Sequence, residues 1–193
     1  MSRRWWRRWM AVAAVAAFGG GCASQLDVRY PESSANPALL SSAGPRGVAI
    51  GPVVDRRVDR TRIGVKPMSQ DPIVARRPVE EIVREALAVE IARTGHSVAS
   101  AGDVVLAAEV EEFWLDAVHR QATTQYIGRV AIALIVVDPH TGSRVLTRRY
   151  AGIKRLQAAP DAEQAWREVM DAALTRTMHD VATDPELAAA LTR

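Results

Sequence analysis

Few side chains in this sequence of 193 residues are of types that could do chemistry. Cys22 carries the only thiol, a group that can accept an acyl or alkyl chain or act as a nucleophile. Three glutamates, at positions 109, 111 and 112, stand close enough for the paired carboxylates of acid–base catalysis. Glu109 and Glu111 share one face of a predicted strand, however, and a solvated strand face also explains them.

The remaining candidates do not form a known constellation. The four histidines have neither the i, i+4 spacing nor the neighbouring cysteines of a metal site: His96, His119, His140 and His179. The segment 44–47 lacks the glycine spacing and the Lys-Ser/Thr ending of a phosphate-binding loop, and no GxSxG motif occurs. The sequence therefore predicts a protein that is not an enzyme and that holds no cofactor or metal.

Cys22 follows a leader that has the three parts of an export signal. Residues 1–9 contain four arginines and three tryptophans, residues 10–18 are apolar, and residues 19–21 are glycines. The apolar run is too short for a membrane-spanning helix, which needs about 20 apolar residues. The Arg3-Arg4 pair also fits a twin-arginine signal, so the general and the twin-arginine export routes both stay open.

The end of this leader resembles the lipobox of bacterial lipoproteins, in which the cysteine is lipidated and becomes the mature N-terminus. Gly20 and Gly21 match its small residues, whereas Gly19 stands where the pattern usually has an aliphatic residue. The resemblance implies an N-acyl chain, such as palmitate, and an S-diacylglycerol group on Cys22. In lipoproteins of Gram-negative bacteria an aspartate after the cysteine favours the inner membrane. Ala23 at that position implies the periplasmic leaflet of the outer membrane.

Removal of the leader changes the charge of the protein. The whole chain has 25 basic and 22 acidic residues, a net charge of +3. The leader contains four of the arginines and no acid, so the mature chain has 21 basic and 22 acidic residues and a net charge of −1. This near-neutral charge argues against nucleic-acid binding, because the mature chain has no excess of basic residues with which to neutralise several phosphates.

The composition predicts three segments: a signal peptide at 1–21, a lipidated N-terminus with a flexible tether at 22–45, and one globular domain at 46–193. The tether contains three prolines and five serines but few large apolar residues, and as a coil it would reach about 25–30 Å. A short extended piece at 26–30 could still join the sheet as an edge strand.

The sequence of the domain predicts the order strand, helix, three strands and helix. The pattern predicts strands at 47–54, 103–115, 125–137 and 143–157 and helices at 78–94 and 161–181. Pro52 predicts an edge strand or a bulge, and the change of phase at Glu111-Glu112 predicts a bulge or a twist. Residues 138–142 have the composition of a hairpin turn. We expect Gly95 to end the first helix, and Asp161 with Gln164 to form a capping box at the second. The tryptophan and methionines of the second helix are expected in the core. Two amphipathic helices on one face of a mostly antiparallel sheet make an α+β two-layer sandwich.

Residues 55–75 are mostly polar, and this composition predicts a long loop with some extended structure. Its mixed charges suit contact with a partner protein, and an ordinary solvated loop remains the alternative. The candidate contact residues are Asp55, Arg56, Arg57, Arg60 and Arg62.

Several short motifs of the domain resemble the YajG family of bacterial lipoproteins. They are Val54-Asp55-Arg56-Arg57, Ile63-Gly64, Thr94-Gly95, Gln125-Tyr126, Tyr150 and Trp166. The resemblance implies a cell-envelope lipoprotein without known catalysis, whose partner is an envelope protein or the cell wall. Auxiliary lipoproteins of ABC-type transport systems, which would bind a lipid or another amphiphile between helices and sheet, show a similar pattern and stay the alternative.

Lipidation makes the first testable prediction. Each buried methylene contributes about 0.8 kcal/mol, so that several acyl chains hold a protein stably on a membrane. Cys22→Ser should release the protein from the membrane fraction or leave its leader uncleaved. Fractionation and intact mass of the extracted protein measure both, and an unchanged mass and distribution would contradict the anchor.

Overall fold

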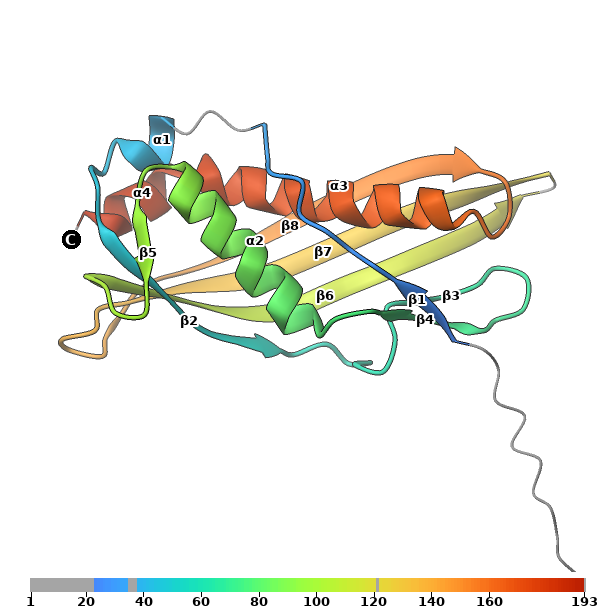
Figure 1. The fold of residues 1–193 in the computed structure, drawn as a ribbon, viewed down its shortest axis with the longest axis horizontal. Coiled ribbons are helices and arrows are strands. Elements are labelled where there is room, and N and C mark those ends of the chain that lie inside the picture. The colour runs from blue at the N-terminus through green and yellow to red at the C-terminus, as the bar shows by residue number, and fades with distance from the viewer. Residues whose placement is uncertain (1–22, 35–37, 121, 193) are drawn as a thin grey trace, which may run out of the picture.

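The computed structural model describes residues 23–34, 38–120 and 122–192. Within them, helices lie across one face of a mixed eight-stranded sheet (Figure 1). The helices are α1 (Ala38–Ser41), α2 (Val79–Arg93), α3 (Glu163–Ala182) and α4 (Pro185–Leu191). The strands are β1 (Ser24–Leu26), β2 (Gly47–Asp55), β3 (Gly64–Val65), β4 (Pro72–Ala75), β5 (Ser97–Ala99), β6 (Val104–Arg120), β7 (Thr123–Val137) and β8 (Arg144–Ala158). The predicted α+β class is confirmed.

The long strands β6, β7 and β8 form an antiparallel meander, as the alternation predicted. The turn between β7 and β8 is closed by Asp138, whose carboxylate accepts a hydrogen bond from the His140 amide at 2.8 Å. Gly142 has a φ of 70°, a conformation that glycine adopts without steric cost. The predicted hairpin at 138–142 is thus confirmed.

Both predicted irregularities are present. The register between β6 and β7 shifts between Val110 and Glu112, and that between β2 and β6 shifts between Ile50 and Val53. The second shift surrounds Pro52, which has no N–H to donate to a neighbouring strand. β5 pairs with β2 only at residues 47–49, so within the described ranges the part of β2 that contains Pro52 pairs with β6 alone and is locally an edge as well.

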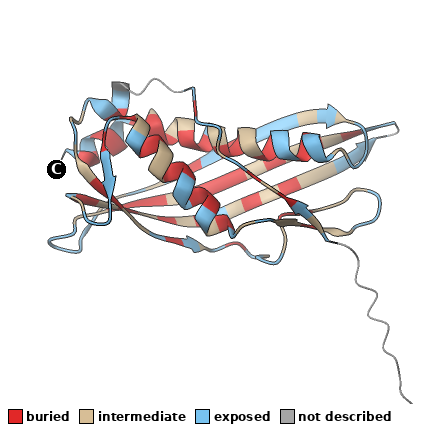
Figure 2. Ribbon diagram, viewed as in Figure 1, coloured by how far each residue is buried: buried red, intermediate tan, exposed pale blue. Residues whose placement is uncertain are grey.

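Helix α3 packs very closely on β7 and β8. Its apolar stripe, which includes Trp166 and Met170, is buried against the sheet, as predicted (Figure 2). Gly128 of β7 and Gly152 of β8 leave room for the helix backbone. A Cβ atom at these positions would lie 2.3 Å from the Val169 carbonyl oxygen and 2.0 Å from that of Ala173, so only glycine fits without a shift.

The predicted capping box of α3 is wrong. The N-cap residue is Ala162, which provides no side-chain hydrogen bond, and Asp161 precedes it with a φ of 55°. Asp161 therefore stands one residue too early to accept from the first amides of the helix. Side-chain capping occurs instead at α4, where Asp184 accepts from the amide of Glu186 at 2.7 Å. At the C-terminus of α2, Gly95 has a φ of 90° and follows the helix as predicted.

The predicted tether at 22–45 differs from the structure in its described part. An edge strand is present, since β1 pairs in parallel with β4, but it lies at Ser24–Leu26 and shares only Leu26 with the piece predicted at 26–30. The polar segment 55–75 contributes β3 and β4 to the same sheet. Leu26, Val28 and Leu40 are fully buried in the core. The segment has few large apolar residues, but β1 contacts α3 and α1 contacts α4, and an average over the composition does not reveal these contacts.

Hydrogen bonds also hold this segment on the domain. The buried carboxylate of Glu90 on α2 accepts from the Tyr30 hydroxyl and, at 3.0 Å, from the Ser33 hydroxyl. The Arg29 amide donates to Asp171 of α3 at 2.9 Å. Burial, together with the neighbouring Glu90, raises the pKa of Tyr30, so that its hydroxyl keeps its proton and stays a donor.

The close approach of α3 makes the second prediction. Gly128→Ala should lower the free energy of unfolding by about 2 kcal/mol, because the new methyl group collides with helix backbone that cannot move alone. Ala151→Val, on an exposed position of β8, adds volume on the other face and should change it by less than about 0.5 kcal/mol. Urea denaturation of both variants measures the difference, and equal midpoints would contradict close packing at Gly128.

Candidate functional site

The predicted contact residues lie where β2 ends and the chain turns toward β3. Cys22 lies outside the described residues, and its lipidation remains a prediction. Of the five loop residues, Asp55 and Arg57 are almost buried, whereas Arg56 stays exposed. The loop therefore has a buried part, at Asp55 and Arg57, which maintains its conformation, and a part that is exposed to solvent, such as Arg56.

Arg57 is the centre of the first part. Its side chain is 7% exposed and makes a two-pronged ion pair with Asp55, with a shortest distance of 2.8 Å. The same guanidinium donates to the carbonyl oxygens of Arg62, at 3.0 Å, and Phe113, at 3.3 Å. Burial by itself would raise the pKa of Asp55, but the hydrogen bonds from Arg57 outweigh it and hold that pKa below its usual value. This pair joins the end of β2, the loop and β6.

The loop makes a second ionic turn further on. Asp59 accepts from the Arg62 guanidinium at 2.6 Å and from the Thr61 hydroxyl at 2.7 Å. These hydrogen bonds lower the pKa of Asp59 to about 2. The Arg62 guanidinium also lies 5.8 Å from the ring centre of Trp114, within reach of a cation–π contact.

The three glutamates considered for acid–base chemistry lie in cross-strand ion pairs. Glu109 contacts Arg56 at 3.3 Å, Glu111 contacts Arg149 at 2.6 Å, and Glu112 contacts Arg129 at 2.6 Å. These side chains are all partly exposed. Each carboxylate therefore has its own cation, and the three do not form a carboxylate pair.

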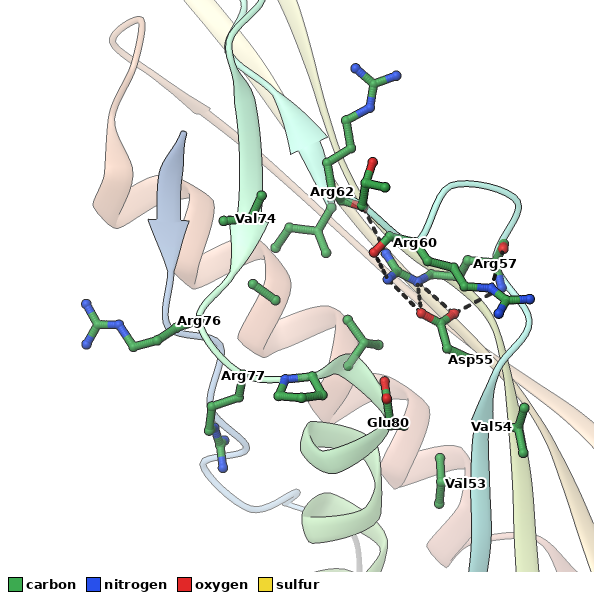
Figure 3. Close-up of a pocket in the computed structure, with 15 residues that line it drawn as sticks. Val53, Val54, Asp55, Arg57, Arg60, Arg62, Val74, Arg76, Arg77 and Glu80 are labelled. Carbon is green, nitrogen blue, oxygen red and sulfur yellow. Dashed lines mark hydrogen bonds and ion pairs between the residues drawn. The ribbon is translucent and has the colours of Figure 1, made fainter. Parts of the chain in front are cut away.

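A cavity of about 640 Å³ opens between the loop, the end of β4 and the first turn of α2 (Figure 3). Five arginines and two carboxylates line it, and three of these arginines, Arg62, Arg76 and Arg77, pair with carboxylates just outside the lining, at Asp59, Asp27 and Glu85. The charged residues are Asp55, Arg57, Arg60, Arg62, Arg76, Arg77 and Glu80. Four of the predicted contact residues are thus brought together, whereas Arg56 is outside the lining.

The cavity has an apolar floor and a charged rim. Val53, Ile63 and Val79 are buried side chains of its lining, and they come from β2, the loop and α2. On the rim, Arg76 is largely exposed and Arg60 donates only to the Arg57 carbonyl oxygen, at 3.4 Å. Within the described ranges, no carboxylate lies in ion-pair contact with Arg60. The arrangement can hold an anionic group over an apolar surface.

Sequence reasoning missed the contribution of Arg76, Arg77 and Glu80. The arginine pair was visible as one of several local pairs, but nothing nearby in the sequence related it to the loop at 56–62. The relation arises because β3 and β4 form a short hairpin that returns the chain to the end of β2.

Metal ligation and membrane crossing have no candidate in the described ranges. No group of three or more potential ligands lies close enough to hold a metal ion there, and none of those helices is long and apolar enough to cross a bilayer. His96 is buried with its Nε2 atom 3.2 Å from the Leu40 carbonyl oxygen, and His119 contacts the Thr124 hydroxyl at 3.2 Å. Both imidazoles thus have structural neighbours.

Fold and site together define a small α+β domain with an open, arginine-rich cavity. A family model described as "uncharacterized lipoprotein" matches residues 52–192, well over half of the chain. The chain belongs to this family of lipoproteins. No curated protein sequence matches it.

Two solved structures share the fold. Protein XCC0632 from Xanthomonas campestris is 15% identical with a TM-score of 0.57, and the match covers 83% of this chain and 92% of that one. Protein CT253 from Chlamydia trachomatis is 11% identical with a TM-score of 0.51, covering 77% and 98%. At these identities the likeness concerns the fold alone.

The buried ion pair makes the third prediction. Arg57→Met should lower the free energy of unfolding by about 3 kcal/mol, because Asp55 and the carbonyl oxygens of Arg62 and Phe113 lose their donor. Arg56→Met is the matched control; its pair with Glu109 is exposed and should contribute less than about 1 kcal/mol. Urea denaturation compares the two, and equal losses would show that Arg57 does not hold the loop.

Proposed function

We propose that the protein is a lipoprotein of the cell envelope, anchored through an N-acyl and an S-diacylglycerol group on Cys22. The leader at 1–21 supports the anchor, and membership of a lipoprotein family supports it independently. The short motifs quoted above favour the YajG branch of such lipoproteins, and Ala23 favours the periplasmic leaflet of the outer membrane.

The domain that follows the anchor is proposed to be a non-catalytic binding module facing the periplasm. The observation that carries this proposal is the open cavity, which gathers arginines from the loop and from the segment between β4 and α2 and has Arg60 on its rim with only a carbonyl contact. Arginine guanidinium groups form two-pronged hydrogen bonds with carboxylates. The ligand class that fits is therefore an acidic segment of an envelope protein.

A second candidate function rests on the floor of the same cavity. Beside the buried Val53, Ile63 and Val79, the lining includes the more exposed side chains of Val54, Val74 and Pro78, an apolar surface that would suit an anionic amphiphile. In that case the protein would act as the auxiliary lipoprotein of an ABC-type transport system. Native mass spectrometry of the extracted protein separates the two functions, because a retained amphiphile adds its own mass.

The fourth prediction tests the binding module with a photo-crosslinking amino acid at position 60 of the full-length, anchored protein. Arg60 lies on the rim, so illumination of intact cells should give a discrete product with one envelope protein. The additional change Arg76→Glu should remove that product, because it reverses a charge on the same rim without touching the crosslinker.

The matched control carries the same amino acid at Arg144, an exposed position of β8 outside the cavity lining. Urea midpoints of all variants verify the fold. The same products from positions 60 and 144, or a product at 60 that survives the charge reversal, would contradict a protein ligand in the cavity.

A further inference from the structure

The described chain enters the sheet almost directly after the proposed lipid anchor. Ser24 is the first residue of β1, and only Ala23 separates it from Cys22. Two residues of fully extended chain span at most about 7 Å. Cys22 therefore lies within about 7 Å of the first residue of β1, and no long tether separates the anchor from the sheet.

The first strand is firmly part of the domain. Leu26 and Val28 are buried, and the Leu26 carbonyl oxygen accepts from the Arg76 amide at 2.9 Å. Glu90 then holds Tyr30 and Ser33 on α2. Release of this segment would expose buried apolar side chains and leave the Glu90 carboxylate without two of its donors, so the distance between the anchor and the domain is fixed.

The pairing of β1 shows which part of the domain is nearest to the anchor. Ser24 lies opposite Ile73, and the next pair of the neighbouring hairpin joins Pro72 to Val65. Since β1 and β4 are parallel, the beginning of β1 lies at the end of β4 from which the β3–β4 turn, residues 66–71, projects. Figure 1 shows this turn beside the start of β1, with the β7–β8 turn at the opposite end of the molecule.

The side chains of the β3–β4 turn suit a lipid surface. Met68 at its tip is 62% exposed, one of the most exposed large apolar side chains among the described residues. Lys66 stands at the base of the turn, where its amide donates to the Asp71 carbonyl oxygen at 2.9 Å. The Asp71 carboxylate, which accepts from the Ser69 hydroxyl at 2.6 Å, balances the charge of Lys66, so the turn presents an apolar tip on a polar base without net charge, as the boundary between acyl chains and headgroups requires.

We propose that the β3–β4 turn lies on the bilayer that holds the acyl chains of Cys22, with Met68 inserted among the headgroups. This inference rests on the proposed lipid anchor and adds an orientation to it. The polar layer of a bilayer is about 5–7 Å thick on each side, comparable to the span from Cys22 to Ser24. The turn is thus within reach of the surface, and the rim at Arg76 lies one residue beyond the other end of β4.

The fifth prediction places an environment-sensitive dye on Met68→Cys in the lipidated full-length protein. The protein is inserted into vesicles of phosphatidylethanolamine and phosphatidylglycerol, and the thioether of lipidated Cys22 does not react with the dye. We expect the emission to shift to shorter wavelength and nitroxide-labelled lipids to quench it. The same dye on His140→Cys, in the β7–β8 turn, should show neither effect.

A longer linker tests the fixed distance. Insertion of about 20 glycine and serine residues between Ala23 and Ser24 adds a reach of about 25 Å. The protein should stay bound to the vesicles while the quenching at position 68 is lost.

Intact mass separates the two proposals. An acylated, vesicle-bound protein whose dye at position 68 stays unquenched, or is quenched no more than at position 140, overturns the orientation and leaves the anchor standing. A protein without acyl mass overturns the anchor, and the orientation with it.

Discussion

The close packing of α3 on β7 and β8 is the contact on which the rest of this structure depends. Gly128 and Gly152 let the helix backbone approach the sheet, and the apolar stripe of α3 then fills the layer between them. The ring of Trp166 meets that of Tyr126 edge to face, with 6.3 Å between the ring centres. Next to α3, which it contacts, α2 packs on the part of the same face over β2 (Figure 1).

Buried polar contacts hold two segments around this core, the N-terminal strand region and the loop after β2. Glu90 is completely buried and binds Tyr30 and Ser33, while Asp55 and Arg57 form a pair at the end of β2. A buried charge is costly unless hydrogen-bonding partners surround it, so each of these groups selects one arrangement of its segment. The first holds the N-terminal strand and the second holds the loop, and the cavity opens between the loop, β4 and α2.

Patterns of short range predicted the strands and helices of the core. Alternation in β7, the turn at 138–142 and the stripe around Trp166 depend on neighbours that are close in sequence, and all were confirmed. The capping of α3 was not, because a shift of one residue removes the hydrogen bond without changing the composition. The N-terminal strand was predicted only as an alternative, at 26–30, and it lies at Ser24–Leu26, since the polar average of this segment conceals the buried Leu26.

The sequence by itself determined the local chemistry: the leader before Cys22, the period of each main element and the arginines of the loop. These features depend on residue types at fixed spacing. Tertiary structure alone decided that Arg76 joins Arg57 at one cavity and that β1 lies beside the β3–β4 turn. Parallel pairing joins segments about 50 residues apart, as Ser24 and Ile73 show, and no pattern within either segment encodes its partner.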